Sequence, residues 1–372
     1  MTKRISCTIL FLVSSFAITA NAATTAVVGT CKSGPKFATI QAAVNAVAPS
    51  GKVFVCPGVY PEQVTISQPL TLQGVLDTNS DAGSAVLSVP AAGLIQNADY
   101  LVGVIGIAAQ LLVQNTAGPV TINDITVDGS NAACPNPLYW VGVGFGESVS
   151  ATLTNSSVKN VTSADCLYGA AIAAGRSSSA TITNNSVHGC ATGILVGDDA
   201  TSAKVTGNAI SNCGGLSAGA GIAIGSMTGP VTVSSNVVHV SFGSDPSVAP
   251  YGIFVGGVHG SPALVSNNVI VGTRVGQSSG IAMTDVVGPT ITGNKISGAY
   301  VGISLQGVTG GLIQRNIVSD TDAGISTGRP GDGNTVSGNT INDALCGIYA
   351  PTTPANKFYN VGVRNCYSSG IP

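Results

Sequence analysis

The sequence predicts an all-β fold, a β-solenoid in which short strands stack coil upon coil. One observation is a repeated template, a β-branched run, a corner that ends in Asn, and a second short β run. The corner recurs at spacings of 23, 28, 32, 26, 22 and 23 residues, at Asn185, Asn208, Asn236, Asn268, Asn294, Asn316 and Asn339. Repeats of this length indicate coils that bury their apolar residues against their neighbours.

A second motif, Gly-Ile-x-apolar, precedes the corners. It begins at Gly193, Gly221, Gly252, Gly280 and Gly302, and the shorter Gly324-Ile325 and Gly347-Ile348 continue it. Because side chains alternate along a strand, we expect Ile to point inward and Gly outward. Asn tolerates left-handed backbone at a sharp corner, and stacked Asn side chains can hydrogen-bond along a column. An antiparallel protein with hairpin turns at Asn and Gly is the alternative, which the coil-like spacing disfavours.

The composition supports many strands and argues against some functions. The 372 residues include 49 Gly, and 44% are hydrophobic whereas 8% are charged. Disorder requires the opposite balance. The net charge of −2 argues against the strongly basic surface that nucleic-acid-binding proteins have.

The first 22 residues resemble a secretory signal peptide. Lys3 and Arg4 precede a short apolar run at 9–18, and Ala20-Asn21-Ala22 is a small-x-small cleavage site. A membrane anchor is the alternative, but the run is too short to span a bilayer, and no later run is long enough. We therefore expect a secreted or periplasmic protein without a membrane span, whose residues 23–372 form one domain.

The cysteines predict disulfides. Cys7 would leave with the signal peptide, and eight cysteines remain. An even number in an exported chain favours disulfides, and sequential separations near one repeat length favour sequential pairs. The predicted pairs are Cys31–Cys56, Cys134–Cys166, Cys190–Cys213 and Cys346–Cys366. Isolated buried thiols are the alternative.

An amphipathic helix is predicted near the N-terminus. Ile40, Ala43, Val44 and Val47 form an apolar stripe, and Thr39 is a suitable N-cap. Pro49-Ser50-Gly51 ends the helix, and short strands follow at 52–56, 64–66 and 70–72. Such a helix predicts a cap over the first coil, which would otherwise expose its core and strand edges.

The opening residues resemble those of a known family. Four segments carry the resemblance: Phe37-Ala38-Thr39-Ile40-Gln41-Ala42-Ala43, Gly51-Lys52-Val53-Phe54-Val55, Pro57-Gly58-Val59-Tyr60-Pro61-Glu62 and Leu70-Thr71-Leu72-Gln73-Gly74. They are similar to the start of secreted proteins of the pectate-lyase-like superfamily, which has the pectin lyase fold. With the repeats, the resemblance covers about residues 31–366. It implies a right-handed parallel β-helix, here of about ten to twelve coils with an N-terminal helix cap.

Candidate catalytic residues come from aligning the repeats on Gly-Ile. Glu147, Asp198 and Asp285 then share one column with Arg329, five places after the Gly. Neighbouring carboxylates can act as acid and base or hold calcium, so calcium is the one cofactor considered. Asp198 and Asp285 are three coils apart, roughly 14 Å, which is long for a glycosidase pair. The alternative is that these carboxylates are ordinary turn residues.

Two aromatic residues are candidates for substrate binding. Trp140 and Tyr300 each precede a Gly-Ile strand by two places, and a flat ring on the outer face could stack on a sugar. The alternative is that these rings pack beneath inserted loops. A further column, three places after the Asn corner, holds Lys159, His188, Ser211 and His239, for which surface exposure is the simpler interpretation.

The functional prediction is an exported β-helix protein that acts on or binds an extracellular polysaccharide, with acidic polymers among the candidates. If catalytic, it would be a lyase or a hydrolase, and Arg329 could pair with a uronate carboxylate. The alternative is a non-catalytic secreted adhesin, scaffold or glycan-binding module. The characteristic motifs of pectin methylesterases, polygalacturonases and alginate epimerases are absent apart from a lone Asp198-Asp199. No catalytic residue is therefore carried over from a family.

Overall fold

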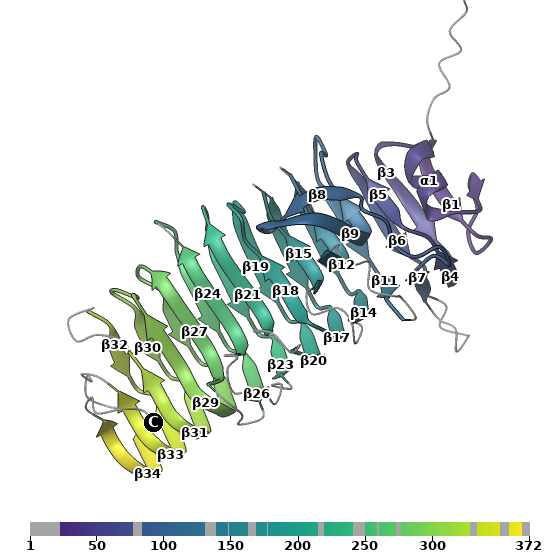
Figure 1. Cartoon of the computed structure of the whole chain (residues 1–372). Coiled ribbons are helices and arrows are strands. Elements are labelled where there is room, and N and C mark those ends of the chain that lie inside the picture. The colour runs from purple at the N-terminus through teal and green to yellow at the C-terminus, as the bar shows by residue number, and fades with distance from the viewer. Residues whose placement is uncertain are drawn as a thin grey trace, which may run out of the picture.

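The chain winds into an elongated stack of coils (Figure 1). The computed structural model describes residues 23–76, 84–130, 139–147, 149–162, 169–176, 178–214, 219–240, 250–258, 260–272, 277–327, 333–349 and, for the backbone, 357–366. The predicted signal peptide, residues 1–22, lies outside the described residues. No helix among the described residues is long and apolar enough to cross a membrane.

One sheet contributes one strand to each coil. Its thirteen described strands are, in spatial order, β2 (Lys36–Phe37), β1 (Ala23–Val28), β3 (Val47–Val55), β6 (Leu70–Gly74), β10 (Val120–Asn123), β13 (Ser150–Thr154), β16 (Ser179–Thr183), β19 (Ser202–Thr206), β22 (Val231–Ser234), β25 (Ala263–Ser266), β28 (Thr290–Thr292), β30 (Leu312–Gln314) and β32 (Thr335–Ser337). Neighbours pair in parallel, as in β16–β19 and β19–β22. Eleven of these described strands run from β3 to β32, which agrees with the predicted number of coils.

The second sheet wraps around the rest of the stack. Its described strands are β4 (Gly58–Pro61), β5 (Val64–Ile66), β7 (Ala85–Ser88), β8 (Ala98–Leu101), β9 (Val104–Val113), β11 (Ile125–Asp128), β12 (Tyr139–Phe145), β14 (Ser157–Val161), β15 (Gly169–Ala174), β17 (Ser186–Cys190), β18 (Thr192–Val196), β20 (Ala209–Cys213), β21 (Ala220–Met227), β23 (Val237–Val240), β24 (Tyr251–Val258), β26 (Val269–Gly272), β27 (Ser279–Val286), β29 (Lys295–Gln306), β31 (Ile317–Ser326), β33 (Thr340–Tyr349) and β34 (Lys357–Cys366). We call β12, β15, β18, β21, β24 and β27, with the C-terminal parts of β29, β31 and β33, the Gly-Ile strip.

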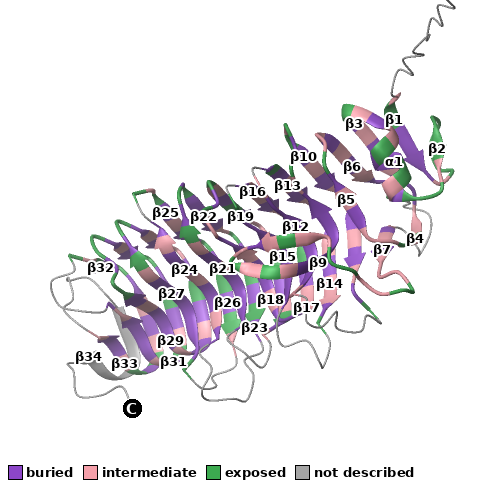
Figure 2. Cartoon of the chain, turned by 45° about the horizontal axis from the view of Figure 1, so that its top comes forward, coloured by how far each residue is buried: buried purple, intermediate pink, exposed green. Residues whose placement is uncertain are grey.

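The core fills the interior of the coils. Along the Gly-Ile strip, each Ile of the motif pairs with the Ile of the next coil, from Ile194 through Ile222 and Ile253 onward. These side chains are fully buried, as predicted. Much of the strands is buried, and the exposed residues gather at the turns (Figure 2).

The glycines of the motif differ from the prediction that they point outward. Gly193, Gly221 and Gly280 are buried. A Cβ built on Gly280 would lie 2.7 Å from the carbonyl oxygen of Gly302 in the next coil. The motif therefore needs Gly because two backbones approach each other closely, and not because the position faces solvent.

The Asn corners form the predicted ladder. The Asn268 amide donates to Asn294 Oδ1 at 2.9 Å, and Asn268 Oδ1 accepts from the backbone and the amide of Asn236 at 3.0 Å. The same pattern joins the other corners from Asn185 to Asn339. These side chains are buried, so the ladder satisfies polar groups that water cannot reach.

The predicted helix is present as α1 (Ile40–Ala46), at the N-terminal end of the stack (Figure 1). The Thr39 hydroxyl accepts from Ala42 N at 3.1 Å, which confirms the N-cap. Glu62 accepts from the backbone N–H of Ile40 at 2.7 Å and of Gln41 at 3.0 Å. Ile40, Ala43 and Val44 are buried, whereas Val47 already begins β3. Its role as a cap stays a prediction.

Two of the predicted disulfides are present in the described residues. Cys31 pairs with Cys56 and Cys190 with Cys213, with Cα–Cα distances of 5.6 Å and 4.5 Å. Cys346 is also disulfide-bonded. The side chain of Cys366, and both members of the predicted pair Cys134–Cys166, lie outside the described residues.

Candidate functional site

The predicted column of charged residues exists, with one correction. It runs along the end of the Gly-Ile strip, where the left-handed backbone turns each coil. Its described members are Glu147, Arg176, Asp198, Ser226, Gly257, Asp285 and Gly307. In β15, counting five places from Gly169 predicts Ala174 for this column, but β15 pairs Ala174 with Phe145 and Val196. Arg176 therefore takes that place, between Glu147 and Asp198, and Arg329 lies outside the described residues.

Glu147 and Asp198 are linked through two residues that the sequence alignment did not reveal. The Arg176 guanidinium forms an ion pair with Glu147. It also lies over the ring of Tyr100, 4.8 Å from the ring centre. The Tyr100 hydroxyl donates to Asp198 Oδ1 at 2.9 Å. We call Tyr100, Glu147, Arg176 and Asp198 the hairpin cluster.

Tyr100 reaches the column because it belongs to an inserted hairpin. Strands β8 and β9 pair antiparallel and turn through Val102 and Gly103, both with positive φ. The hairpin lies across the Gly-Ile strip (Figure 1). Leu101 lies over Gly144, and Val102 lies over Gly175, where an added Cβ would come within 3.3 Å and 3.0 Å of the hairpin.

The hairpin rests on an apolar cluster of its own. Leu101, Ile107, Leu112 and Val141 are buried together on the outer side of the strip, separate from the main core. This packing holds Val102 in a left-handed conformation that is rare for a β-branched residue. This packing therefore fixes the position of the hairpin on the strip, and Asp198 lies at the edge of the hairpin.

A pocket of about 410 Å³ opens between the hairpin and the strand ends. Its lining is mainly polar and includes Gln96, Asn97, Asp99, Gln114, Asn115, Tyr100, Glu147 and Arg176. The hydrogen bond to Asp198 raises the pKa of Tyr100, so the phenol stays protonated as a donor. Amide, hydroxyl and charged groups in one pocket can hydrogen-bond a hydroxyl-rich ligand.

The other candidates lie elsewhere. Asp285 is exposed and three coils beyond Asp198. Tyr300 is half-buried and lines a second pocket on the same strip. Trp140 is fully buried in the main core, so its ring cannot stack on a sugar at the surface. His188 is half-buried and His239 exposed, in register with Lys159 as predicted.

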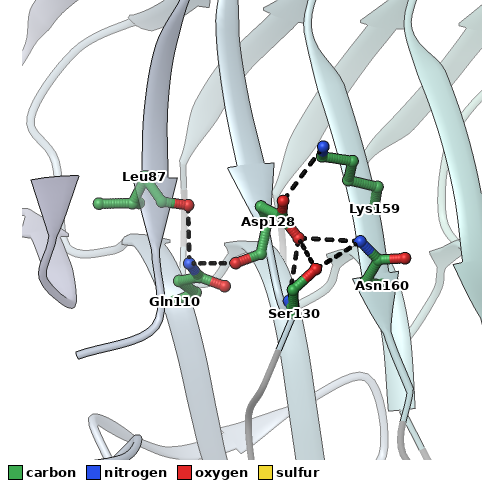
Figure 3. Close-up of polar contacts among 6 residues, drawn as sticks. All are labelled: Leu87, Gln110, Asp128, Ser130, Lys159 and Asn160. Carbon is green, nitrogen blue, oxygen red and sulfur yellow. Dashed lines mark hydrogen bonds and ion pairs between the residues drawn. The ribbon is translucent and has the colours of Figure 1, made fainter. Parts of the chain in front are cut away.

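A further polar cluster surrounds Asp128 at the end of β11 (Figure 3). Its carboxylate accepts from Ser130 Oγ at 2.6 Å and Asn160 Nδ2 at 2.9 Å, and pairs with Lys159 at 3.1 Å. Beside it, the buried Gln110 amide donates to the carbonyls of Leu87 and Asp128. Burial opposes the charge of Asp128, but the hydrogen bonds from Ser130, Asn160 and Lys159 outweigh it and lower the pKa to about 2.

This pKa predicts acid sensitivity. Because the folded-state pKa lies below the unfolded value, the ionised Asp128 stabilises the fold above about pH 4 and loses this effect as the pH falls towards about 2. We expect the loss to be on the order of 1–2 kcal/mol, after allowance for solvent screening. Urea unfolding between those pH values should show a shallower pH dependence for Asp128→Asn than for the wild type. Equal slopes would contradict the prediction.

Two family profiles match parts of the chain. The family described as "Right handed beta helix region" matches residues 110–245, and "Periplasmic copper-binding protein (NosD)" matches residues 230–362. No curated protein matches the chain.

The described residues of the second segment do not fit a copper site. Copper prefers imidazole, thiolate and thioether ligands. Within the described part of 230–362, Met283 is fully buried, Cys346 is disulfide-bonded and His239 stands on an exposed strand. No group of three or more His, Cys, Asp or Glu side chains that could hold a metal occurs among the described residues.

Several solved structures are similar to the chain at low sequence identity. The GH136 lacto-N-biosidase from Eubacterium ramulus is 12% identical with a TM-score of 0.59, covering 90% of this chain and 67% of that one. The Azotobacter vinelandii mannuronan C-5 epimerase AlgE6 A-module is 18% identical with a TM-score of 0.47 (89% and 94%). The GH87 α-1,3-glucanase from Streptomyces thermodiastaticus is 13% identical with a TM-score of 0.38 (88% and 65%). The parallel coils and the match to the right-handed β-helix family model over residues 110–245 show that the chain has a right-handed parallel β-helix fold.

Proposed function

We propose that this chain is an exported β-helix protein that binds extracellular polysaccharide along the outer face of the Gly-Ile strip. The observation that carries the proposal is the polar pocket of about 410 Å³ beside the hairpin cluster. Polysaccharides expose hydroxyl groups at every residue, and this lining offers amides, a phenol and charged groups to them. The disulfides and the periplasmic family that matches 230–362 support export.

Cleavage of the polymer is the second candidate, and the placement of Glu147 and Asp198 favours it. The two residues are two coils apart, about 10 Å at a strand spacing of about 4.8 Å. This spacing is close to the upper limit for two carboxylates that flank an attacking water in inverting hydrolysis. Asp285 is too distant to join the pair, so it takes no part in this candidate mechanism.

The cluster assigns different tasks to its members. Arg176, which lies between the carboxylates, would orient Glu147 and could contact an acidic sugar. Tyr100 would orient Asp198, because its hydroxyl donates to the carboxylate. Glu147 and Asp198 are then the proposed pair of proton-transfer groups.

If the protein cleaves polysaccharide, Asp198→Asn and Glu147→Gln should each lower the rate at least about a hundredfold, because each removes a proton-transfer group. The control is Asp124→Asn, since Asp124 also sits at a left-handed corner but on another side of the coil. The measurement is the release of reducing ends, or of unsaturated ends for a lyase. Full activity in Asp198→Asn would remove Asp198 from the mechanism.

The deciding experiment separates binding, cleavage and a purely structural role. The oxidised protein is incubated with plant and bacterial polysaccharides, with and without calcium, and examined by size-exclusion chromatography and affinity electrophoresis. Retarded migration without shortening supports binding, and shortened polymers establish an enzyme. Calcium dependence would point to carboxylates as metal ligands. If no polysaccharide in the panel is cleaved or retards the protein, the result would favour the alternative, a secreted adhesin or scaffold.

A further inference from the structure

A second pocket lies further along the Gly-Ile strip, towards the C-terminal end. Strands β24, β27, β29 and β31, which lie side by side in Figure 1, supply most of its walls. Its volume is about 310 Å³. That is the small end of the range for ligand pockets, which begins near 300 Å³. The hairpin does not reach these strands in the described register, so this pocket is separate from the hairpin cluster.

The floor of the pocket consists of three small residues in one column. Ala282 pairs with Ser304, and Ser304 pairs with Ser326, in successive coils. Residues paired in parallel register share a face, so all three point outward. Small side chains in three consecutive coils leave a depression in the outer surface of the strip.

Aromatic residues bound this floor along the axis. In the same column, Phe254 pairs with Ala282 on one side, and Tyr349 pairs with Ser326 on the other. Both are partly exposed. Tyr251 lies beside Phe254 with the ring centroids 5.2 Å apart. Tyr251 lines the pocket and therefore gives the depression a flat aromatic surface at its Phe254 end, which can stack on the C–H face of a pyranose ring.

Uncharged polar groups surround the remaining sides. Gln277, Thr284, Tyr300 and Gln306 line the pocket together with the hydroxyls of Ser279, Ser304 and Ser326. Amides and hydroxyls both donate and accept hydrogen bonds, which matches the hydroxyl groups of a sugar.

The charges near the pocket are unfavourable for an acidic ligand. None of the described lining residues is charged. Asp285 directly follows Thr284, and burial together with the negative charge of Asp322 raises the pKa of Tyr300. A uronate in this pocket would lie near two carboxylates and would find no cation among the described lining residues, which disfavours its binding.

We infer that this pocket binds an uncharged saccharide unit, stacked on Tyr251 and hydrogen-bonded by Tyr300 and Gln306. The inference rests on the proposed function, because it gives one section of the same polysaccharide-binding face its substrate class. It implies that a bound polymer presents a neutral sugar here, whatever charge it presents at Arg176.

The test uses isothermal titration calorimetry on the oxidised mature protein. The probes are cellohexaose, maltohexaose, laminarihexaose and xylohexaose as neutral oligosaccharides, and hexagalacturonate as the acidic one. We expect at least one neutral probe to bind, with Kd raised at least tenfold by Tyr300→Ala and by Gln306→Ala. Gln306 is exposed, so its replacement leaves the core intact. His239→Ala, on an exposed strand outside the strip, is the matched control that keeps the wild-type Kd.

The other outcomes overturn the inference in distinguishable ways. Preferred binding of hexagalacturonate over the neutral probes, weakened by Gln306→Ala, would show that the site takes acidic sugars. Neutral probes that bind equally well to Tyr300→Ala and Gln306→Ala would remove this site while the proposed function stands. Failure of every polysaccharide to retard the wild-type protein in affinity electrophoresis would remove the proposed function together with the inference.

Discussion

Asn268→Ala is expected to lower the free energy of unfolding by about 4 kcal/mol. Asn268 is fully buried and makes four side-chain hydrogen bonds, to Val233 O, to Asn294 Oδ1 and with two donors of Asn236. Alanine leaves several of these partners buried without a replacement. Each unsatisfied group costs about 1–3 kcal/mol, so the losses in a ladder add to a large effect. Chemical denaturation of the oxidised protein measures this difference.

The neighbouring Asn267 provides the control. It is exposed and has a left-handed backbone, with φ of 56°. Glycine occupies the equivalent corner at Gly207 and Gly293, so Asn267→Gly should change the free energy of unfolding by less than about 0.5 kcal/mol. Equal destabilisation by the two substitutions would show that the corner conformation matters, and not the buried ladder.

Gly280→Ala is expected to destabilise the fold by about 3 kcal/mol. The added methyl group would collide with the Ile296 side chain and lie 2.7 Å from the Gly302 carbonyl oxygen. Neither the strand spacing nor the buried Ile can yield without disturbing the next coil, and overpacking of this kind typically costs 1–3 kcal/mol. Thermal and urea unfolding should both report the loss.

Gly225→Ala is the matched control, because Gly225 lies in the same strip without a positive φ. A Cβ there would be 3.9 Å from its nearest neighbour, the Gly256 carbonyl oxygen. We expect a change within about 0.5 kcal/mol. A loss in Gly225→Ala as large as that in Gly280→Ala would mean that close approach of the next coil does not govern these glycines, since the lower chain entropy of alanine would stabilise the fold.

The repeat could be predicted from the sequence because it is physically redundant. Each Asn corner and each Ile of the motif makes the same contact in every coil, so Asn268 or Ile281 could be placed from spacing alone. The glycines of the motif were placed on the wrong side, because alternation along a strand ignores the approach of the next backbone, seen at Gly280.

The candidate site was less predictable, because it depends on residues that do not repeat. Glu147 and Asp198 can be identified from the repeat, but Arg176 cannot. Gly169 pairs with Trp140 and not with Gly142, so counting from Gly169 falls two residues short of Arg176. Tyr100 comes from an inserted hairpin 98 residues before its partner Asp198. A contact of this separation leaves no trace in a repeat pattern. The residues around Trp140 in the sequence do not indicate that its side chain is buried. Only the structure shows that it lies in the main core.

The ladder also has an electrical consequence. In each link from Asn185 to Asn339, the amide N–H of one Asn points to the amide oxygen of the Asn in the following coil. The carboxamide dipoles therefore add along the axis and polarise one another, whereas backbone dipoles in a sheet largely cancel. The column is a buried macrodipole whose positive end points towards the C-terminal coils, the coils that carry Asp320, Asp322 and Asp343.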